Sequence, residues 1–196
     1  LLNRSPDLSE RARAICPGIP LVLLAFHHRE LDKVRAEVQQ AFDNVFIWNG
    51  DSTMLLTIIK LVEDRVNVVA DTDQVGVRVI ILVENSIRFY SAYLPLMYSE
   101  VMRQSSALIN ESINSATRRV RMRARPKVLL CRTYEEAWSY FTRYEEHVLG
   151  VISDIEFPKD GKLDRQAGLK FAGEVRRLRP DVSIMLQSSL PKNESL

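Results

Sequence analysis

An acidic loop and two further polar clusters each directly follow an apolar run of the sequence. The loop is Asp154-Ile155-Glu156-Phe157-Pro158, and the other two clusters are Glu84-Asn85 and Ser188-Ser189. If the three runs form adjacent parallel strands, their carboxyl ends meet at the end of the sheet where open α/β proteins keep their ligand sites. We therefore expect an acid, a second acid and a hydroxyl to surround one crevice.

Together these groups suit phosphoryl transfer. Asp154 would be the nucleophile, the carboxylates would hold a hard divalent cation such as Mg²⁺, and Ser188 would donate a hydrogen bond to the transferred group. Taken singly, each cluster also has an ordinary explanation, because Asp is common in loop caps, and Glu and Asn both occur where a helix begins. The chemistry therefore depends on all three clusters meeting.

Short β-branched runs alternate with longer amphipathic stretches, a pattern typical of strand–helix–strand units and a parallel sheet. The predicted fold class is therefore α/β. The predicted strands are 21–25, 45–48, 77–83, 127–131, 148–153 and 182–187. The predicted helices are 8–16, 29–42, one that begins at Ser52, 86–124, 134–145 with Thr133 as its cap, and 166–178; residues 68–76 have linker character, and 154–164 and 190–196 are expected to be loops.

The composition indicates a folded protein without a strong electrostatic field. Hydrophobic residues make up 46% and charged residues 27% of the 196 positions, which lies in the globular range. The net charge is only +2, and the basic excess is gathered in 118–125, for which a solvated helix end is the simplest interpretation. Neither a nucleic acid nor a membrane partner is therefore indicated.

Cysteine spacing and hydropathy exclude further classes of protein. Cys16 and Cys131 are far apart, and His27-His28 has no ligand partners at a suitable spacing, so we expect neither a disulfide framework nor a zinc site. No apolar run approaches the roughly 20 residues that a membrane-spanning helix needs. Because the first residues lack an initiator Met and the features of a signal peptide, we expect a cytoplasmic protein of which this chain is a fragment.

The arrangement of the three clusters resembles the receiver domains of two-component signalling. In that family the first strand ends in an acidic pair, the third in a phosphorylated Asp followed by x-x-(Met/Phe)-Pro, and the fourth in Thr or Ser. Glu84-Asn85, Asp154 to Pro158 and Ser188 match those positions, and Gly168-Leu169 matches the start of the helix that follows. The resemblance implies a flavodoxin-like fold with helices on both faces of the sheet, Asp154 as the phosphoacceptor, and a Mg²⁺ site formed by Glu84, Asn85, Asp154 and the Glu156 backbone carbonyl.

Two departures from the family pattern bear on this site. Asn85 stands where the family usually has the acid that binds the metal directly, and the loss of that charge should weaken Mg²⁺ binding because hard cations favour carboxylates. The family's Lys after a fifth strand has no counterpart, and Lys192 comes too early to serve. Phosphorylation is therefore expected to be slow or absent.

The first part of the chain resembles the back half of a second, degenerate receiver over 1–70, with Ala25 at the hydroxyl position and Asn49 near the Lys position. Residues 71–76 would be a linker. Residues 77–196 would form a receiver that has a long helical insertion at about 100–125 and lacks its last strand and helix. Tandem receivers of this kind resemble the amino-terminal part of bacterial proteins that also carry a phosphoenolpyruvate/pyruvate-binding domain. Because each part lacks what the other contains, one sheet completed by borrowing the strand 45–48 is a further hypothesis.

The resemblance also implies partners. A histidine kinase or phosphotransfer protein would supply the phosphoryl group, and the long helix offers a surface for a homodimer. Phosphorylation of Asp154 would draw the Ser188 loop inward and change a docking face, with at most an autophosphatase activity. Two alternatives stay open: a pseudo-receiver that is not phosphorylated and serves as an interaction or dimerisation module, and a small phosphatase, for which no second acid follows at the spacing of a general acid.

Overall fold

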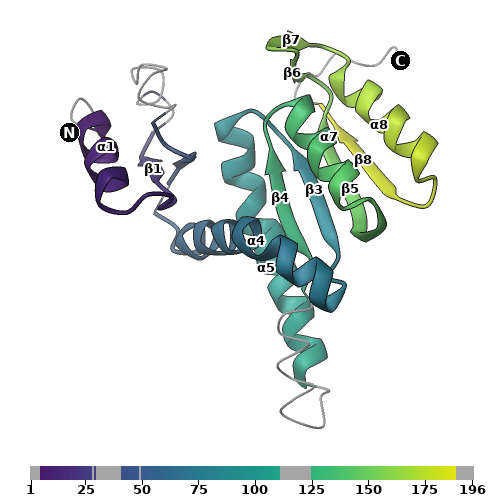
Figure 1. The fold of residues 1–196 in the computed structure, drawn as a ribbon, viewed down its shortest axis with the longest axis horizontal. Helices are drawn as coiled ribbons and strands as arrows, with labels where there is room; N and C mark the ends of the chain where they lie inside the picture. The colour runs from purple at the N-terminus through teal and green to yellow at the C-terminus, as the bar shows by residue number, and fades with distance from the viewer. Residues whose placement is uncertain (1–4, 28, 30–40, 49, 111–124, 189–196) are drawn as a thin grey trace.

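A four-stranded parallel sheet forms the centre of the computed structural model, which describes residues 5–27, 29, 41–48, 50–110 and 125–188 (Figure 1). Its strands are β3 (Val79–Val83), β4 (Lys127–Cys131), β5 (Val148–Asp154) and β8 (Ser183–Gln187), in the order β4-β3-β5-β8. All three pairings are parallel. The predicted α/β class is confirmed.

Helices cover both faces of this sheet, which explains why its strands are apolar almost throughout. One face carries α7 (Tyr134–Arg143) and α8 (Ala167–Leu178), and Val79, Ile81 and Val83 of β3 point into that core. The other face carries α5 (Ile87–Asn110), against which Leu82 of β3 packs. Thr133 is the cap of α7, as expected, and its hydroxyl accepts the Glu136 N–H at 3.2 Å.

The helix α4 (Thr53–Val75) lies beside β4, the edge strand of the sheet. Its Asp64 carboxylate accepts the backbone N–H of Val128 at 3.0 Å, so a side chain satisfies a group that an open sheet edge would leave unpaired. Residues 68–75, for which the sequence indicated linker character, are the last two turns of this helix. Burial of Val68 and Thr72 outweighs the weak helix preference of a segment rich in β-branched residues.

The elements near the amino terminus are α1 (Ser5–Ile15), β1 (Val22–Ala25) and β2 (Asn44–Ile47), and α1 and β1 lie on the opposite side of the molecule from α8 (Figure 1). β1 and β2 form a separate parallel pair. Within the described residues, β2 pairs with β1 and does not join the four-stranded sheet. The strand 45–48, which the sequence suggested as a borrowed strand, therefore pairs with β1 and adds nothing to the four-stranded sheet among the described residues.

The unit formed by β1 and β2 contacts the beginning of α5. The Tyr90 hydroxyl donates to the Val45 carbonyl, and the Ile47 N–H donates to the Ser91 hydroxyl at 3.1 Å. At the carboxyl end of β4, Arg132 donates to the Asp43 carbonyl at 3.1 Å. These hydrogen bonds hold the β1–β2 unit next to the loop that follows β3.

The segment 154–164 is more ordered than the sequence analysis predicted. It contains a hairpin of β6 (Phe157–Lys159) and β7 (Lys162–Asp164), in place of the expected loop. The two turn residues, Asp160 and Gly161, both have positive φ, at 51° and 74°. Asp-Gly between short strands is a strong hairpin signal, because both central residues of this turn type need a left-handed conformation.

Other predicted boundaries agree with the structure to within a few residues or lie outside what it describes. A short 3₁₀ helix, Glu145–His147, follows α7, where the sequence predicted a continuous helix to 145. α5 contains Pro95 in its interior and is described to Asn110. The predicted helix 29–42 and the part of the long insertion beyond 110 fall largely outside the described residues. None of the described helices combines the length and the apolar character that crossing a bilayer requires.

Candidate acidic site at the carboxyl end of the sheet

Glu84 directly follows β3 and is almost completely buried, with 1% of its surface exposed. Its backbone N–H donates to the Cys131 carbonyl at 2.9 Å, which continues the β3–β4 pairing by one residue. Its carboxylate accepts two hydrogen bonds, from the Ser86 N–H to Oε1 at 2.9 Å and from Gln187 Nε2 to Oε2 at 3.1 Å. Both oxygens of Glu84 thus face polar donors at the end of the sheet.

Asp154 is the last residue of β5, the strand next to β3, and is 8% exposed. Its Oδ1 accepts the Ile155 N–H at 2.7 Å, and the backbone N–H of Glu156 also hydrogen-bonds to this carboxylate. Glu84 and Asp154 lie near enough for the charge of Asp154 to raise the pKa of Glu84. The structure therefore brings together the two acids on which the sequence argument most depends.

Burial governs the titration of both acids. It raises the pKa of Glu84 from its ordinary 4.5 to about 7, and the negative charge of Asp154 adds to this effect. Burial also raises the pKa of Asp154, and the nearby Glu156 contributes in the same direction. Among the described residues, no lysine or arginine offsets these shifts at either carboxyl. Within the part of the chain that the structure describes, two acids are therefore buried together without a basic partner.

The loop after Asp154 is held tightly against α8. The Gly168 N–H donates to the Ile155 carbonyl at 3.0 Å. A Cβ at position 168 would lie 2.1 Å from the Asp154 carbonyl oxygen, a distance that no real side chain tolerates. Only glycine therefore allows the helix to approach the Asp154 backbone this closely.

The other predicted site residues lie around this pair. Asn85 is half-buried in the loop between β3 and α5, and Glu156 is half-buried in the loop after β5. Ser188 follows β8 immediately and is exposed. The register pairs Asp154 with Gln187, so Ser188 lies one residue beyond the position opposite the acid.

Gln187 is the residue of this site that sequence reasoning missed. Its side chain bonds to Glu84, and its backbone carbonyl accepts the Ile155 N–H at 3.1 Å. The only signal in the sequence was its place at the end of the last apolar run, directly before Ser188. A single polar residue at a strand end does not reveal that it reaches across a neighbouring strand.

The donor set fits a hard divalent cation. Two buried carboxylates that have no basic partner among the described residues gain from a metal ion, which would remove the electrostatic cost of holding both ionised. Asn85 could add an amide oxygen from the same loop. Within the described ranges, no three His, Cys, Asp or Glu side chains converge as an ion site. Glu84 and Asp154 would therefore have to be supplemented by amide, backbone or water oxygens.

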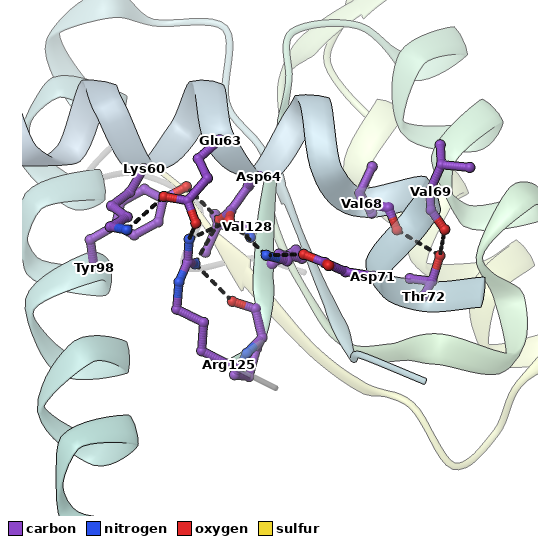
Figure 2. A network of polar contacts seen from close by, with 12 residues as sticks. Lys60, Glu63, Asp64, Val68, Val69, Asp71, Thr72, Tyr98, Arg125 and Val128 are labelled. Atoms are coloured by element: carbon purple, nitrogen blue, oxygen red, sulfur yellow. Dashed lines mark hydrogen bonds and ion pairs between the residues drawn. The ribbon is translucent and has the colours of Figure 1, made fainter. Parts of the chain in front are cut away.

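A second charged cluster lies at the opposite, amino-terminal end of the sheet (Figure 2). Arg125 Nη2 and Asp64 Oδ1 form an ion pair at 2.6 Å, and Arg125 Nη1 donates to Asp64 Oδ2 at 3.1 Å. Lys127 Nζ lies 2.6 Å from Asp71 Oδ2, and the Tyr98 hydroxyl donates to Asp64 Oδ2 at 2.9 Å. The Arg125 side chain is only 4% exposed, so the interpretation of residues 118–125 as a solvated helix end is wrong for Arg125. The remainder of this basic run lies outside the described residues.

A cavity of about 430 Å³ borders this cluster between α4 and α5. Lys60, Arg125 and Lys127 line it, and each of these cations is paired with a carboxylate of α4. Because each cation among the described lining residues already has a carboxylate partner, these residues offer no surplus charge to a ligand. The acidic pair at the other end remains the stronger candidate site.

Comparison of the chain with family models, with curated proteins and with solved structures found no match.

Proposed function

We propose that the region from about residue 77 onward is a receiver that accepts a phosphoryl group on Asp154 and acts as a conformational switch. One observation carries this proposal: Glu84 and Asp154, two buried acids, meet at the carboxyl ends of the neighbouring strands β3 and β5. A divalent cation, expected to be Mg²⁺, would bind between them.

The strand order supports the same reading. Numbered within this region, β4-β3-β5-β8 is the order 2-1-3-4, which is that of the first four strands of a flavodoxin-like sheet. β3 and β5 are the strands on either side of the point where the winding direction changes, and such open sheets bind ligands there. The acidic pair thus lies where this fold would place a phosphoryl-transfer site.

The chemistry follows from the groups at hand. An oxygen of the Asp154 carboxylate would attack the phosphorus of a phosphohistidine on a kinase or phosphotransfer protein; the new O–P bond forms as the N–P bond breaks, and the released imidazole takes up a proton. When bound, the cation would neutralise charge on the transferred group. Asn85 supplies no charge to the cation, so its affinity should be low. The Ile155 N–H bonds to Oδ1 of Asp154 and would hold the carboxylate in place during the attack.

Acetyl phosphate with millimolar Mg²⁺ tests the proposal. Intact-mass spectrometry should detect one added phosphoryl group on the wild-type chain and none on Asp154→Asn. Asp160→Asn is a matched control, because Asp160 is an exposed aspartate of the nearby hairpin turn and Asn tolerates the same left-handed conformation. A mass shift that survives Asp154→Asn, or none in any variant, would refute phosphorylation at this residue.

Exposed apolar side chains on α4 favour a second candidate, a pseudo-receiver that serves as an interaction module. Leu55, Ile59 and Val66 are 44%, 61% and 66% exposed, respectively, and their spacing of four and seven residues places them on one side of the helix, where a partner protein would contact them. This candidate predicts that neither beryllofluoride nor acetyl phosphate modifies the protein at millimolar Mg²⁺. It also predicts that Ile59→Glu and Val66→Glu reduce self-association measured by analytical ultracentrifugation.

A further inference from the structure

We propose that the side chain of Gln187 competes with the divalent cation for Glu84, so that cation binding requires this side chain to leave. The inference rests on the proposed function, because it concerns the same acidic site. It assigns Gln187 a positioning role: the residue holds Glu84 when no cation is bound and sets the affinity of the site.

The side chain of Gln187 extends across the end of a neighbouring strand to reach Glu84. Gln187 belongs to β8 and Glu84 follows β3, and β5 lies between these two strands. The hydrogen bond from Gln187 Nε2 to Glu84 Oε2, 3.1 Å long, therefore passes over the end of β5, where Asp154 is located. Gln187 occupies the space across which Glu84 and Asp154 would share an ion.

The Nε2 group of Gln187 and a divalent cation would occupy the same carboxylate oxygen of Glu84. An amide N–H group donates to a carboxylate but has no lone pair with which to bind a cation. Glu84 Oε1 already accepts the Ser86 N–H at 2.9 Å, so Oε2 is the oxygen on which a cation and the Gln187 amide would compete. In the absence of a cation, the amide dipole partly compensates the buried acid.

The side chain of Gln187 can move while its backbone stays in place. Its backbone carbonyl accepts the Ile155 N–H at 3.1 Å and its neighbours pair with β5, so the main chain is fixed. The side chain itself is only half-buried. A rotamer change would therefore free Glu84 without disturbing the sheet, and would also change the surface beside Ser188.

Calorimetric titration with Mn²⁺, which favours the same oxygen ligands as Mg²⁺, tests the inference on the purified chain. Gln187→Met keeps the length of the side chain and removes the donor, so the dissociation constant should fall by about tenfold, the effect of one hydrogen bond to a charged group. Gln104→Met is the matched control. Gln104 Nε2 also donates to a glutamate, Glu100, at 2.7 Å, but at an exposed site on α5, and its loss should leave the dissociation constant unchanged.

Each outcome of the Mn²⁺ titration either supports or overturns the competition between Gln187 and the cation. Equal affinity in wild type and Gln187→Met, or weaker binding by the variant, overturns the competition and leaves the phosphoacceptor proposal standing. Tighter binding by Gln187→Met supports the competition even if acetyl phosphate fails to modify Asp154, in which case only the proposed function falls. Saturable binding by neither protein refutes the cation site and both proposals with it. Gln187→Ala, checked by its thermal melt, repeats the test if the Met variant does not fold.

Discussion

The buried acids at the two ends of the four-stranded sheet have different kinds of partner. At the amino end, Asp64 is completely buried, but Arg125, Tyr98 and the Val128 N–H surround its carboxylate. At the carboxyl end, Glu84 is equally buried, but its neighbours are a second acid and two neutral donors. The first arrangement is complete within the protein, and the second would be completed by a cation.

This difference separates groups that maintain the fold from groups available for chemistry. A buried charge with matched partners fixes the position of α4 against β4 and has nothing left to offer a ligand. A buried acid without a basic partner retains an unfavourable energy that a cation or a proton can relieve. Perturbed acids of the second kind are therefore better markers of a functional site than charge clusters in general.

Removal of one partner at the amino end should have the largest effect. Arg125→Met leaves the Asp64 charge buried beside Tyr98 and Lys127, and we expect it to lower the free energy of unfolding by about 4 kcal/mol, as is usual when a buried ion pair is broken. Urea denaturation followed by circular dichroism measures this loss.

Arg103→Met is the matched control for that variant. Arg103 also pairs with a carboxylate, Glu100 at 2.7 Å, but both side chains are exposed, so Arg103→Met should lose far less stability than Arg125→Met. Similar losses in the two variants would mean that the buried cluster contributes no more than a surface pair, and the contrast between the two ends would disappear.

At the carboxyl end, the comparison predicts a stability that depends on pH. In EDTA, the folded state holds a proton on Glu84 up to a pKa of about 7, whereas the unfolded chain releases it near 4.5. The folded state binds more protons between these values, so the contribution of Glu84 to stability falls as pH rises through this window. Glu84→Gln lacks this dependence.

We therefore expect Glu84→Gln to gain stability relative to the wild type by about 3 kcal/mol between pH 4.5 and pH 8, in proportion to the shift in pKa. Thermal or urea unfolding of both proteins across this range measures the difference. Millimolar Mg²⁺ should stabilise only the wild type at the upper end. A constant difference across the range would show that Glu84 is already compensated.

The sequence predicted the strands of the four-stranded sheet well. Of the charged groups at its two ends, it predicted the acidic pair but not the Asp64–Arg125 pair. Buried parallel strands are short apolar runs with clear limits, and Pro126 and Thr133 bracket β4 so that its predicted bounds, 127–131, are confirmed. The acids after β3 and β5 were found because parallel strands end at the same side. Both features follow from local sequence and one rule of topology.

The features that were missed depend on pairing through space. The Asp64–Arg125 pair joins residues 61 positions apart, and nothing in the basic run around Arg125 indicates burial. The buried residues of α4 include Thr57, Asp64 and Thr72, whereas the apolar residues Leu55 and Ile59 are exposed, so the side of this helix that packs does not follow from hydrophobicity alone. Gln187 reaches across a strand, which no spacing rule describes.

The smallest predicted effect compares two tyrosines on one helix. Tyr98 and Tyr90 are both buried on α5, two turns apart, and each hydroxyl donates one hydrogen bond, Tyr98 to the Asp64 carboxylate and Tyr90 to the Val45 carbonyl. Bonds to charged groups are stronger, so Tyr98→Phe should lower the free energy of unfolding by about 2 kcal/mol and Tyr90→Phe by about 1 kcal/mol. Urea denaturation of the two variants side by side resolves this difference, because the shape and burial of the ring are kept in both. Equal losses would indicate that the remaining donors around Asp64 fully replace the missing hydroxyl, and that the amino-end cluster holds more partners than its charge requires.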